Sequence, residues 1–60
     1  MTLRAIVVDD EPLARDELTF LLGQCKRVDV VGEARGAAEA QKLCDDERPE
    51  VAFIAVSYTH

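Results

Sequence analysis

The feature that most restricts the fold of this chain is the alternation of three short apolar runs with two segments of helical periodicity. The apolar runs are residues 5–8, 28–34 and 51–56. Each is short and rich in β-branched residues, which is typical of strands. Strands that alternate with helices form parallel sheets with right-handed crossovers. The sequence therefore predicts an α/β fold with a doubly wound parallel sheet, in the order strand, helix, strand, helix, strand.

The first two apolar runs differ in how many polar residues they contain. Residues 5–8, "AIVV", show no alternation with polar residues, which predicts a strand that is buried on both faces of the sheet. Residues 28–34, "VDVVGEA", carry Asp29 and Glu33 among the apolar positions. This more polar composition favours a place at the edge of the sheet.

The first helical segment begins at Pro12, which suits the first turn because its missing N–H would have no partner there. Asp10 or Glu11 is expected to cap the open N–H groups, and Gly23 to end the helix. Helical spacing predicts an apolar face made of Ala14, Leu18, Leu21, Leu22 and Cys25. Arg15 is expected on the opposite, polar side together with the acidic residues at 16 and 17.

The second helical segment follows Gly36, and Pro49 is expected to stop it at or before Arg48. The residues predicted to face the sheet are Ala37, Ala40, Leu43 and Cys44.

Composition excludes several classes of function. The chain has 7 basic and 12 acidic residues, a net charge of -5, and no basic cluster with interleaved aromatics, so we expect no nucleic acid to bind this chain. No apolar run approaches membrane-spanning length and the opening residues do not form a signal peptide. Cys25 and Cys44 both fall in expected helices, and we interpret them as small apolar residues of a reducing compartment. These features predict a cytoplasmic protein.

Asp9 and Asp10 follow the first strand directly, at the carboxyl end of a parallel strand, which is where binding sites lie in open parallel sheets. Adjacent carboxylates are costly at the end of a buried strand unless a cation neutralises them. All-oxygen ligation by one or two carboxylates suits Mg²⁺. The simpler alternative is that Asp10 caps the following helix and that Asp9 is solvated.

The stretch "RAIVVDDEPLARDEL" resembles the start of a bacterial response-regulator receiver domain, a flavodoxin-like fold. Its "DDEPLAR" is similar to the branch whose receivers precede a LytTR-type DNA-binding domain. "VVGEARGAAEA" and "RPEVAFIAV" resemble the second strand and helix and the third strand of such receivers. The resemblance runs from about Leu3 to Ile54, so we expect residues 1–60 to be the amino-terminal portion of a receiver domain.

This resemblance implies a phosphorelay. A sensor histidine kinase donates a phosphoryl group to an aspartate at the end of the third strand, with Mg²⁺ bound beside it. By resemblance, Asp10 is the expected direct ligand of Mg²⁺, Asp9 is expected to act through water, and the backbone carbonyl of Ser57 is expected to complete the metal shell. The whole parent protein would then be a DNA-binding transcriptional regulator.

The sequence departs from the family pattern at the phosphoacceptor position, where it has Ala55. A methyl group has no nucleophilic oxygen, so no acyl phosphate can form there and we expect no enzymatic activity. From Ala55 onward nothing matches, and the ending "VSYTH" leads us to interpret residues 55–60 as a non-native tail.

Two other functions stay open. A pseudo-receiver would work through protein contacts alone and would accept Ala55 as it stands. A fragment of a Mg²⁺-dependent α/β hydrolase is disfavoured because such enzymes space their acids as D-x-D, whereas here Asp9 and Asp10 are adjacent. A nucleotide-binding half-domain is weaker still, because no G-x-G-x-x-G follows the first strand.

Overall fold

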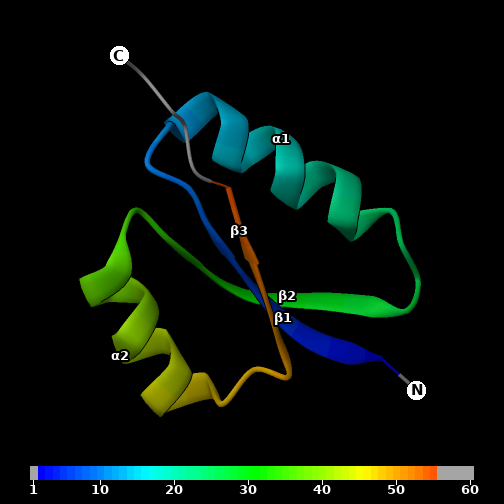
Figure 1. The fold of residues 1–60 in the computed structure, drawn as a ribbon. Helices are drawn as coiled ribbons and strands as arrows, with labels where there is room; N and C mark the ends of the chain where they lie inside the picture. The colour runs from blue at the N-terminus through cyan, green and yellow to red at the C-terminus, as the bar shows by residue number, and fades with distance from the viewer. Residues whose placement is uncertain (1, 56–60) are drawn as a thin grey trace.

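A computed structural model describes residues 2–55 of the chain as three parallel strands and two helices (Figure 1). The elements alternate along the chain as the sequence predicts, and the sheet has the strand order β2-β1-β3. Their bounds are β1 Leu3–Val8, α1 Pro12–Gly23, β2 Val28–Ala34, α2 Ala37–Glu47 and β3 Val51–Ile54. The predicted doubly wound α/β fold is confirmed, and β2 lies at the edge of the described sheet as expected.

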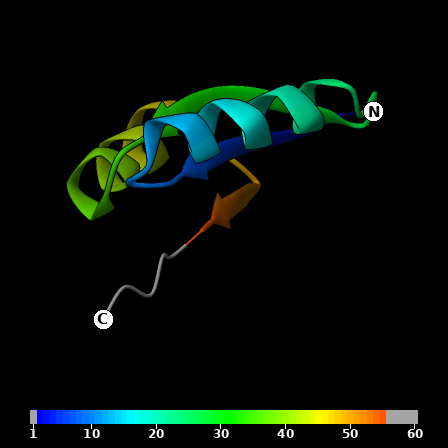
Figure 2. The same ribbon diagram turned by 90° about the horizontal axis from the view of Figure 1, so that it is seen from above.

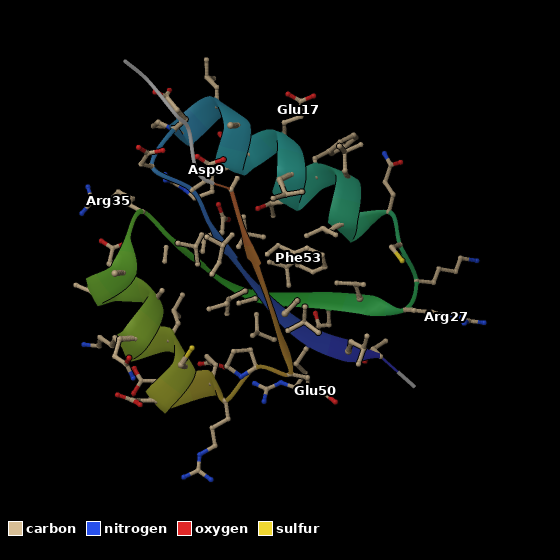
Figure 3. All side chains as sticks on the ribbon, in the orientation of Figure 1. Asp9, Glu17, Arg27, Arg35, Glu50 and Phe53 are labelled. Atoms are coloured by element: carbon tan, nitrogen blue, oxygen red, sulfur yellow. The ribbon has the colours of Figure 1, made fainter. Side chains whose placement is uncertain are left out.

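The two helices lie on opposite faces of the sheet (Figure 1). Partners in register on parallel strands share a face, and β1 pairs Val7 with Glu33 on one side and with Phe53 on the other. This face belongs to α1, because Arg15 of α1 forms an ion pair with Glu33. Phe53 projects toward the same side (Figure 3). The other face belongs to α2, where the side chain of Leu43 packs over Gly32.

The hydrophobic core is centred on β1, whose apolar run is buried on both faces as the sequence predicts. Ala5, Ile6 and Val7 have no exposed surface, and Val8 is 8% exposed. On the α2 face, Ile6 and Val8 form a cluster with Ala34 of β2, and Ala40 and Leu43 of α2 pack against it. These contacts hold the carboxyl end of β1, and therefore the acid pair that follows it, against β2 and α2.

A bulge lies in β2 opposite the middle of β1. The register passes from Ala5 paired with Val30 to Ile6 paired with Gly32, so Val31 is the extra residue. Gly32 then lies directly under α2, and a Cβ atom at this position would fall 2.7 Å from Cδ2 of Leu43. A glycine at this position lets the Leu43 side chain of α2 pack closely on the strand.

The inward face of α1 differs from the predicted one. The half-buried residues of α1 are Arg15, Leu18, Thr19 and Leu22. The prediction was wrong for Ala14 and Leu21, which are exposed, and for Arg15, whose side chain is only 15% exposed. Cys25 was also wrongly placed in a helix, since α1 ends at Gly23. The helical period fixes the spacing of a face, whereas contacts with the sheet fix its rotation.

The ends of the helices follow their sequence signals in part. Pro12 begins α1 and Glu11 is the N-cap residue, yet within the described part of the chain the Glu11 side chain makes no capping hydrogen bond. At the end of α2, Arg48 adopts a left-handed conformation with φ 48° just before Pro49. The N–H of Arg48 donates to the carbonyl of Cys44 over 3.1 Å, which closes the last turn. The predicted stop at or before Arg48 is therefore confirmed.

Strand β3 is shorter than predicted and stands clear of both helices at one side of the sheet (Figure 2). It ends at Ile54, whose side chain is 65% exposed, and Ala55 follows outside the strand. The remaining residues of the predicted strand and tail, 56–60, lie outside the described residues. Within residues 2–55, no helix is both long enough and apolar enough to cross a membrane.

Candidate metal and phosphoryl site

A hollow of about 230 Å³ opens where β1 and β3 end and α2 begins. Its lining residues are Val8, Asp9, Asp10, Arg35, Gly36, Ala37, Ile54 and Ala55. It combines the carboxyl ends of two parallel strands with the amino end of a helix, which is where ligands bind in open α/β sheets. Figure 3 shows Asp9 and Arg35 at this end of the sheet and Glu50 at the opposite end.

Asp9 is the most enclosed polar residue of the hollow. The residue is 5% exposed, and its N–H donates to the carbonyl of Ala34 on β2 over 3.0 Å. One carboxylate oxygen, Oδ1, accepts a hydrogen bond from the N–H of Glu11 over 2.9 Å. This contact closes a tight turn around Asp10. The interpretation of Asp9 as a solvated residue is therefore wrong, because burial and two backbone contacts hold it in place.

Asp10 lies at the tip of this turn and is exposed to solvent. It lines the hollow beside Asp9, so the structure brings the two carboxylates of the predicted pair to the same site. The two residues differ in environment, one enclosed and hydrogen-bonded and the other open to water. A cation that keeps part of its hydration shell can reach the exposed carboxylate more easily than the enclosed one.

Ala55 lies on the opposite wall of the hollow, directly after β3. Its N–H donates to the carbonyl of Val8 over 3.0 Å, so the backbone at residue 55 is tied to the end of β1 next to the acid pair. Its side chain is a methyl group, which offers neither a nucleophile nor a metal ligand. The position predicted for the phosphoacceptor is thus at the site, and its chemistry is absent there.

Arg35 and Glu39 form a further part of the rim, at the start of α2. The backbone N–H of Arg35 donates to Oε1 of Glu39 over 3.0 Å, and the guanidinium donates to Oε2 over 2.9 and 3.1 Å. The backbone hydrogen bond, followed by the side-chain hydrogen bonds from the same residue, lowers the pKa of Glu39 below its usual value. Arg35 is thereby held at the rim, with its side chain still 74% exposed.

The remaining predicted ligand, Ser57, lies outside the described residues. Within residues 2–55, no group of three or more His, Cys, Asp or Glu residues is arranged to hold a metal. The site therefore provides a pair of carboxylates, and any further ligands of a cation there would be carbonyls or water. This set is compatible with Mg²⁺, which takes one or two carboxylates and keeps several waters.

Sequence reasoning missed Arg15 as a residue of this end of the sheet. Nη1 of Arg15 donates to the backbone carbonyl of Asp9 over 2.8 Å, and Nε lies 3.6 Å from Oε1 of Glu33. The only signal in the sequence is that Arg15 closes the "DDEPLAR" stretch, six residues after Asp9. Helix α1 begins at Pro12, so Arg15 lies at the end of its first turn, where its side chain reaches back over the turn that carries the acid pair.

Comparison with known proteins agrees with this geometry, although no family model matches the chain. The chain is 40% identical over 57 residues to the sensory transduction protein LytT of Enterococcus faecalis, covering 95% of this chain and 24% of that protein. It is 43% identical over 54 residues to LytT of Bacillus cereus, covering 90% of this chain and 22% of that protein.

A solved structure shares both the fold and the sequence. The signal receiver domain of NarL, described as a response regulator, from Mycobacterium tuberculosis superposes with a TM-score of 0.84 at 38% identity. The match covers 88% of this chain and 43% of that chain. The chain is a fragment of a response-regulator receiver domain of the LytT branch. The expected family is therefore confirmed.

The receiver fragment spans about a quarter of the length of the curated relatives it matches, 24% and 22% for the two LytT proteins. These relatives are named as sensory transduction and response regulatory proteins, and the solved structure is a signal receiver domain. Asp9, Asp10 and Ala55 all line one hollow of this fragment.

Proposed function

We propose that the hollow at the carboxyl ends of β1 and β3 is the phosphorelay site of a receiver domain, with its acceptor side chain replaced. The observation that carries this proposal is that Asp9, Asp10 and Ala55 line one hollow. In this proposal the acid pair binds Mg²⁺, and position 55 is where an aspartate of the parent family would accept the phosphoryl group.

The environments of the acid pair support different roles for its two members. Asp10 is exposed and is proposed as the direct ligand of Mg²⁺, whereas Asp9 is enclosed, has one oxygen engaged by Glu11, and is proposed to act through water. The backbone carbonyl of Ser57 stays a predicted third ligand. When bound, Mg²⁺ supplies positive charge that offsets the charge developing on a transferred phosphoryl group.

The chain as it stands is proposed to be unable to accept a phosphoryl group at residue 55. Acyl-phosphate formation needs a carboxylate oxygen to attack phosphorus, and Ala55 has none. Glu50 is no substitute, because it lies at the opposite end of the sheet, where its N–H donates to the carbonyl of Arg4 over 2.8 Å. The fragment is accordingly proposed to be a signalling module and not an enzyme.

The partner, location and regulatory role of the parent protein are proposed from its relatives. We propose a sensor histidine kinase as the partner of the parent receiver and the cytoplasm as its location. Relatives of this branch include a transcriptional regulatory protein of Salmonella typhimurium, which is 39% identical over 54 residues. We propose that the parent regulates transcription through a LytTR-type DNA-binding domain, with no contact between DNA and this fragment.

A pseudo-receiver is the second candidate function, and Ala55 itself favours it. In that case the native protein would carry an alanine at this position and act through protein contacts alone. Sequencing the genomic DNA across codons 50 to 60 distinguishes the two. An aspartate codon at 55 would mean that residues 55–60 are a non-native tail, whereas an alanine codon would support the pseudo-receiver.

Phosphorylation of the 60-residue chain tests the proposed chemistry. The chain is incubated with Mg²⁺ and a small radiolabelled acyl phosphate, and the covalent label is counted after removal of the donor. We expect no label on the unaltered chain or on Ala55→Asn, and label above that background on Ala55→Asp. The asparagine variant is the matched control, because it has the same size but no nucleophilic carboxylate. Label on the unaltered chain would refute the proposed role of residue 55.

A further inference from the structure

The chemistry proposed above uses the acid pair but assigns no role to Arg15, the last residue of "DDEPLAR". The Arg15 side chain reaches the turn that carries the pair, where its Nη1 donates to the carbonyl of Asp9. Although it lies in the first turn of α1, its side chain is only 15% exposed. Enclosing a guanidinium costs free energy unless its donors find partners. Its partners therefore indicate its role.

The first partner is the peptide group that joins the acid pair. The carbonyl of Asp9 belongs to the same planar unit as the N–H of Asp10. A hydrogen bond of 2.8 Å from Nη1 of Arg15 to this carbonyl therefore fixes the orientation of the whole unit. On the other side of Asp10, the N–H of Glu11 is held by the carboxylate of Asp9 over 2.9 Å. Asp10 thus lies between two fixed peptide groups.

The second partner anchors Arg15 to the sheet. Nε of Arg15 lies 3.6 Å from Oε1 of Glu33 on β2, and the Glu33 side chain is 40% exposed. An ion pair this long and this exposed contributes little stability by itself. It does orient the planar guanidinium so that Nη1 points at Asp9. A lysine has a single point of charge and cannot make both contacts with the same geometry.

We propose that Arg15 is a positioning residue for the acid pair. It holds the peptide unit between Asp9 and Asp10 in the orientation that presents the Asp10 carboxylate to the hollow. The inference rests on the proposed Mg²⁺ site, and it adds a residue on α1 and an anchor on β2 to that site. Losing partners that orient metal ligands typically weakens metal affinity by about 10–100-fold.

A positioning role and a purely electrostatic role of Arg15 predict opposite changes in Mg²⁺ affinity when Arg15 is replaced, so the test distinguishes them. A positive charge beside a carboxylate pair repels a cation, so charge alone predicts that Arg15→Gln binds Mg²⁺ more tightly. Positioning predicts weaker binding, by about tenfold. Arg35→Gln serves as the charge control, because Arg35 lies on the rim of the same hollow and its guanidinium donates to Glu39 on α2.

The experiment is a Mg²⁺ titration of the 60-residue chain, followed through the amide resonances of Asp10 and Glu11 by NMR. We expect about tenfold weaker binding for Arg15→Gln and for Arg15→Lys. We also expect the order parameter of the Asp10 amide, measured without metal, to fall from about 0.85 toward the flexible range below about 0.6. The fold control is Arg4→Gln, which removes an exposed ion pair with Glu47 away from the hollow.

Each outcome decides the inference. Unchanged or tighter Mg²⁺ binding in both Arg15 variants, with an unchanged order parameter at Asp10, overturns the positioning role and leaves the Mg²⁺ site intact. A failure of the unaltered chain to bind Mg²⁺ overturns the site and the inference together. If Arg15→Gln loses the dispersed NMR spectrum of a folded chain, Glu33→Gln is the substitute test, because it removes only the anchor of Arg15. Weaker Mg²⁺ binding by Glu33→Gln then supports the positioning role, and unchanged binding overturns it.

Discussion

Substitution of Gly32 by alanine gives a quantitative test of how closely α2 packs on the sheet. A Cβ atom placed on Gly32 would lie 2.7 Å from Cδ2, 3.0 Å from Cδ1 and 3.4 Å from Cγ of Leu43. Carbon atoms at optimal separation are about 3.5–4.0 Å apart. Gly32→Ala therefore forces the Leu43 side chain away from the sheet, where it now packs against the core cluster of Ile6, Val8 and Ala34.

The size of the effect follows from opposing contributions. Overpacking of a core typically costs about 1–3 kcal/mol, and the clash here involves the flexible end of a side chain, which favours the lower part of that range. Replacing glycine within a strand recovers about 0.5–1 kcal/mol of conformational free energy. We expect Gly32→Ala to lower the free energy of unfolding by roughly 0.5–1 kcal/mol, the cost in the lower part of the overpacking range less the conformational recovery.

Gly23→Ala is the matched control for this substitution. It makes the same chemical change at the end of α1, where no atom of the described residues lies within 4 Å of the added Cβ and the φ of Gly23 is not positive. We expect it to raise the free energy of unfolding by about 0.5–1 kcal/mol. The assay is urea unfolding followed by far-ultraviolet circular dichroism for both variants and the parent chain.

A double-variant cycle with Leu43→Ala isolates the clash. Once the leucine is truncated, Gly32→Ala should no longer destabilise and should raise the free energy of unfolding by about 0.5–1 kcal/mol, because the atoms that it would strike are gone. If Gly32→Ala is as stable as the parent, or is equally costly in the Leu43→Ala background, the proposed close packing of α2 on β2 is wrong.

Three further predictions test other parts of the structure. The buried hydroxyl of Thr19 has no hydrogen-bond partner among residues 2–55, so Thr19→Val should raise the free energy of unfolding by about 1 kcal/mol in the same urea assay, and a lower free energy of unfolding would show that the hydroxyl is satisfied. Arg48 is left-handed at the end of α2, so Arg48→Gly should also stabilise, by about 0.5–1 kcal/mol, and an unchanged urea midpoint would contradict the left-handed cap. The carboxyl of Glu39 should titrate in NMR below its usual pKa, and Arg35→Gln should restore only part of the shift, since the largest cause is the backbone N–H of residue 35. Because the folded pKa of Glu39 is the lower one, its contribution to stability is present above the unfolded pKa and is lost as the pH falls through the folded pKa.

The order and nature of the elements could be predicted from the sequence because each has a strong local signal. Residues 28–34 carry their strand pattern within one short run, and the bounds of β2 agree with that range. Pro12 and Pro49 mark where α1 begins and where α2 must have ended. These signals depend on backbone geometry that proline dictates within a residue or two, so tertiary contacts do not shift them.

The rotation of α1 could not be predicted, because it depends on contacts between elements. Apolar spacing alone favoured a face through Ala14 and Leu21, whereas the helix turns Arg15 and Thr19 toward the sheet. The carbonyl of Asp9 and the carboxylate of Glu33 draw the guanidinium inward. A contact between a helix residue and a turn six positions earlier has no periodic signature in the sequence.

The candidate site could also be predicted only in part, because some of its features depend on contacts that leave no pattern in the sequence. The acid pair and Ala55 could be placed together, because the carboxyl ends of adjacent parallel strands meet at one edge of the sheet. The difference in burial between Asp9 and Asp10 could not be predicted, because it depends on the turn that the hydrogen bond from Glu11 closes. That difference now supports distinct roles for the two carboxylates.

The most direct test of the account is whether Mg²⁺ binds at the acid pair. In a Mg²⁺ titration of the 60-residue chain, the amide resonances of Asp10, Glu11 and Ala55 should shift together and saturate. Asp10→Asn should abolish these shifts, while Glu17→Gln, on the outer side of α1 (Figure 3), should leave them unchanged. Shifts spread over all acidic residues, or saturable binding that survives Asp10→Asn, would contradict the proposed site.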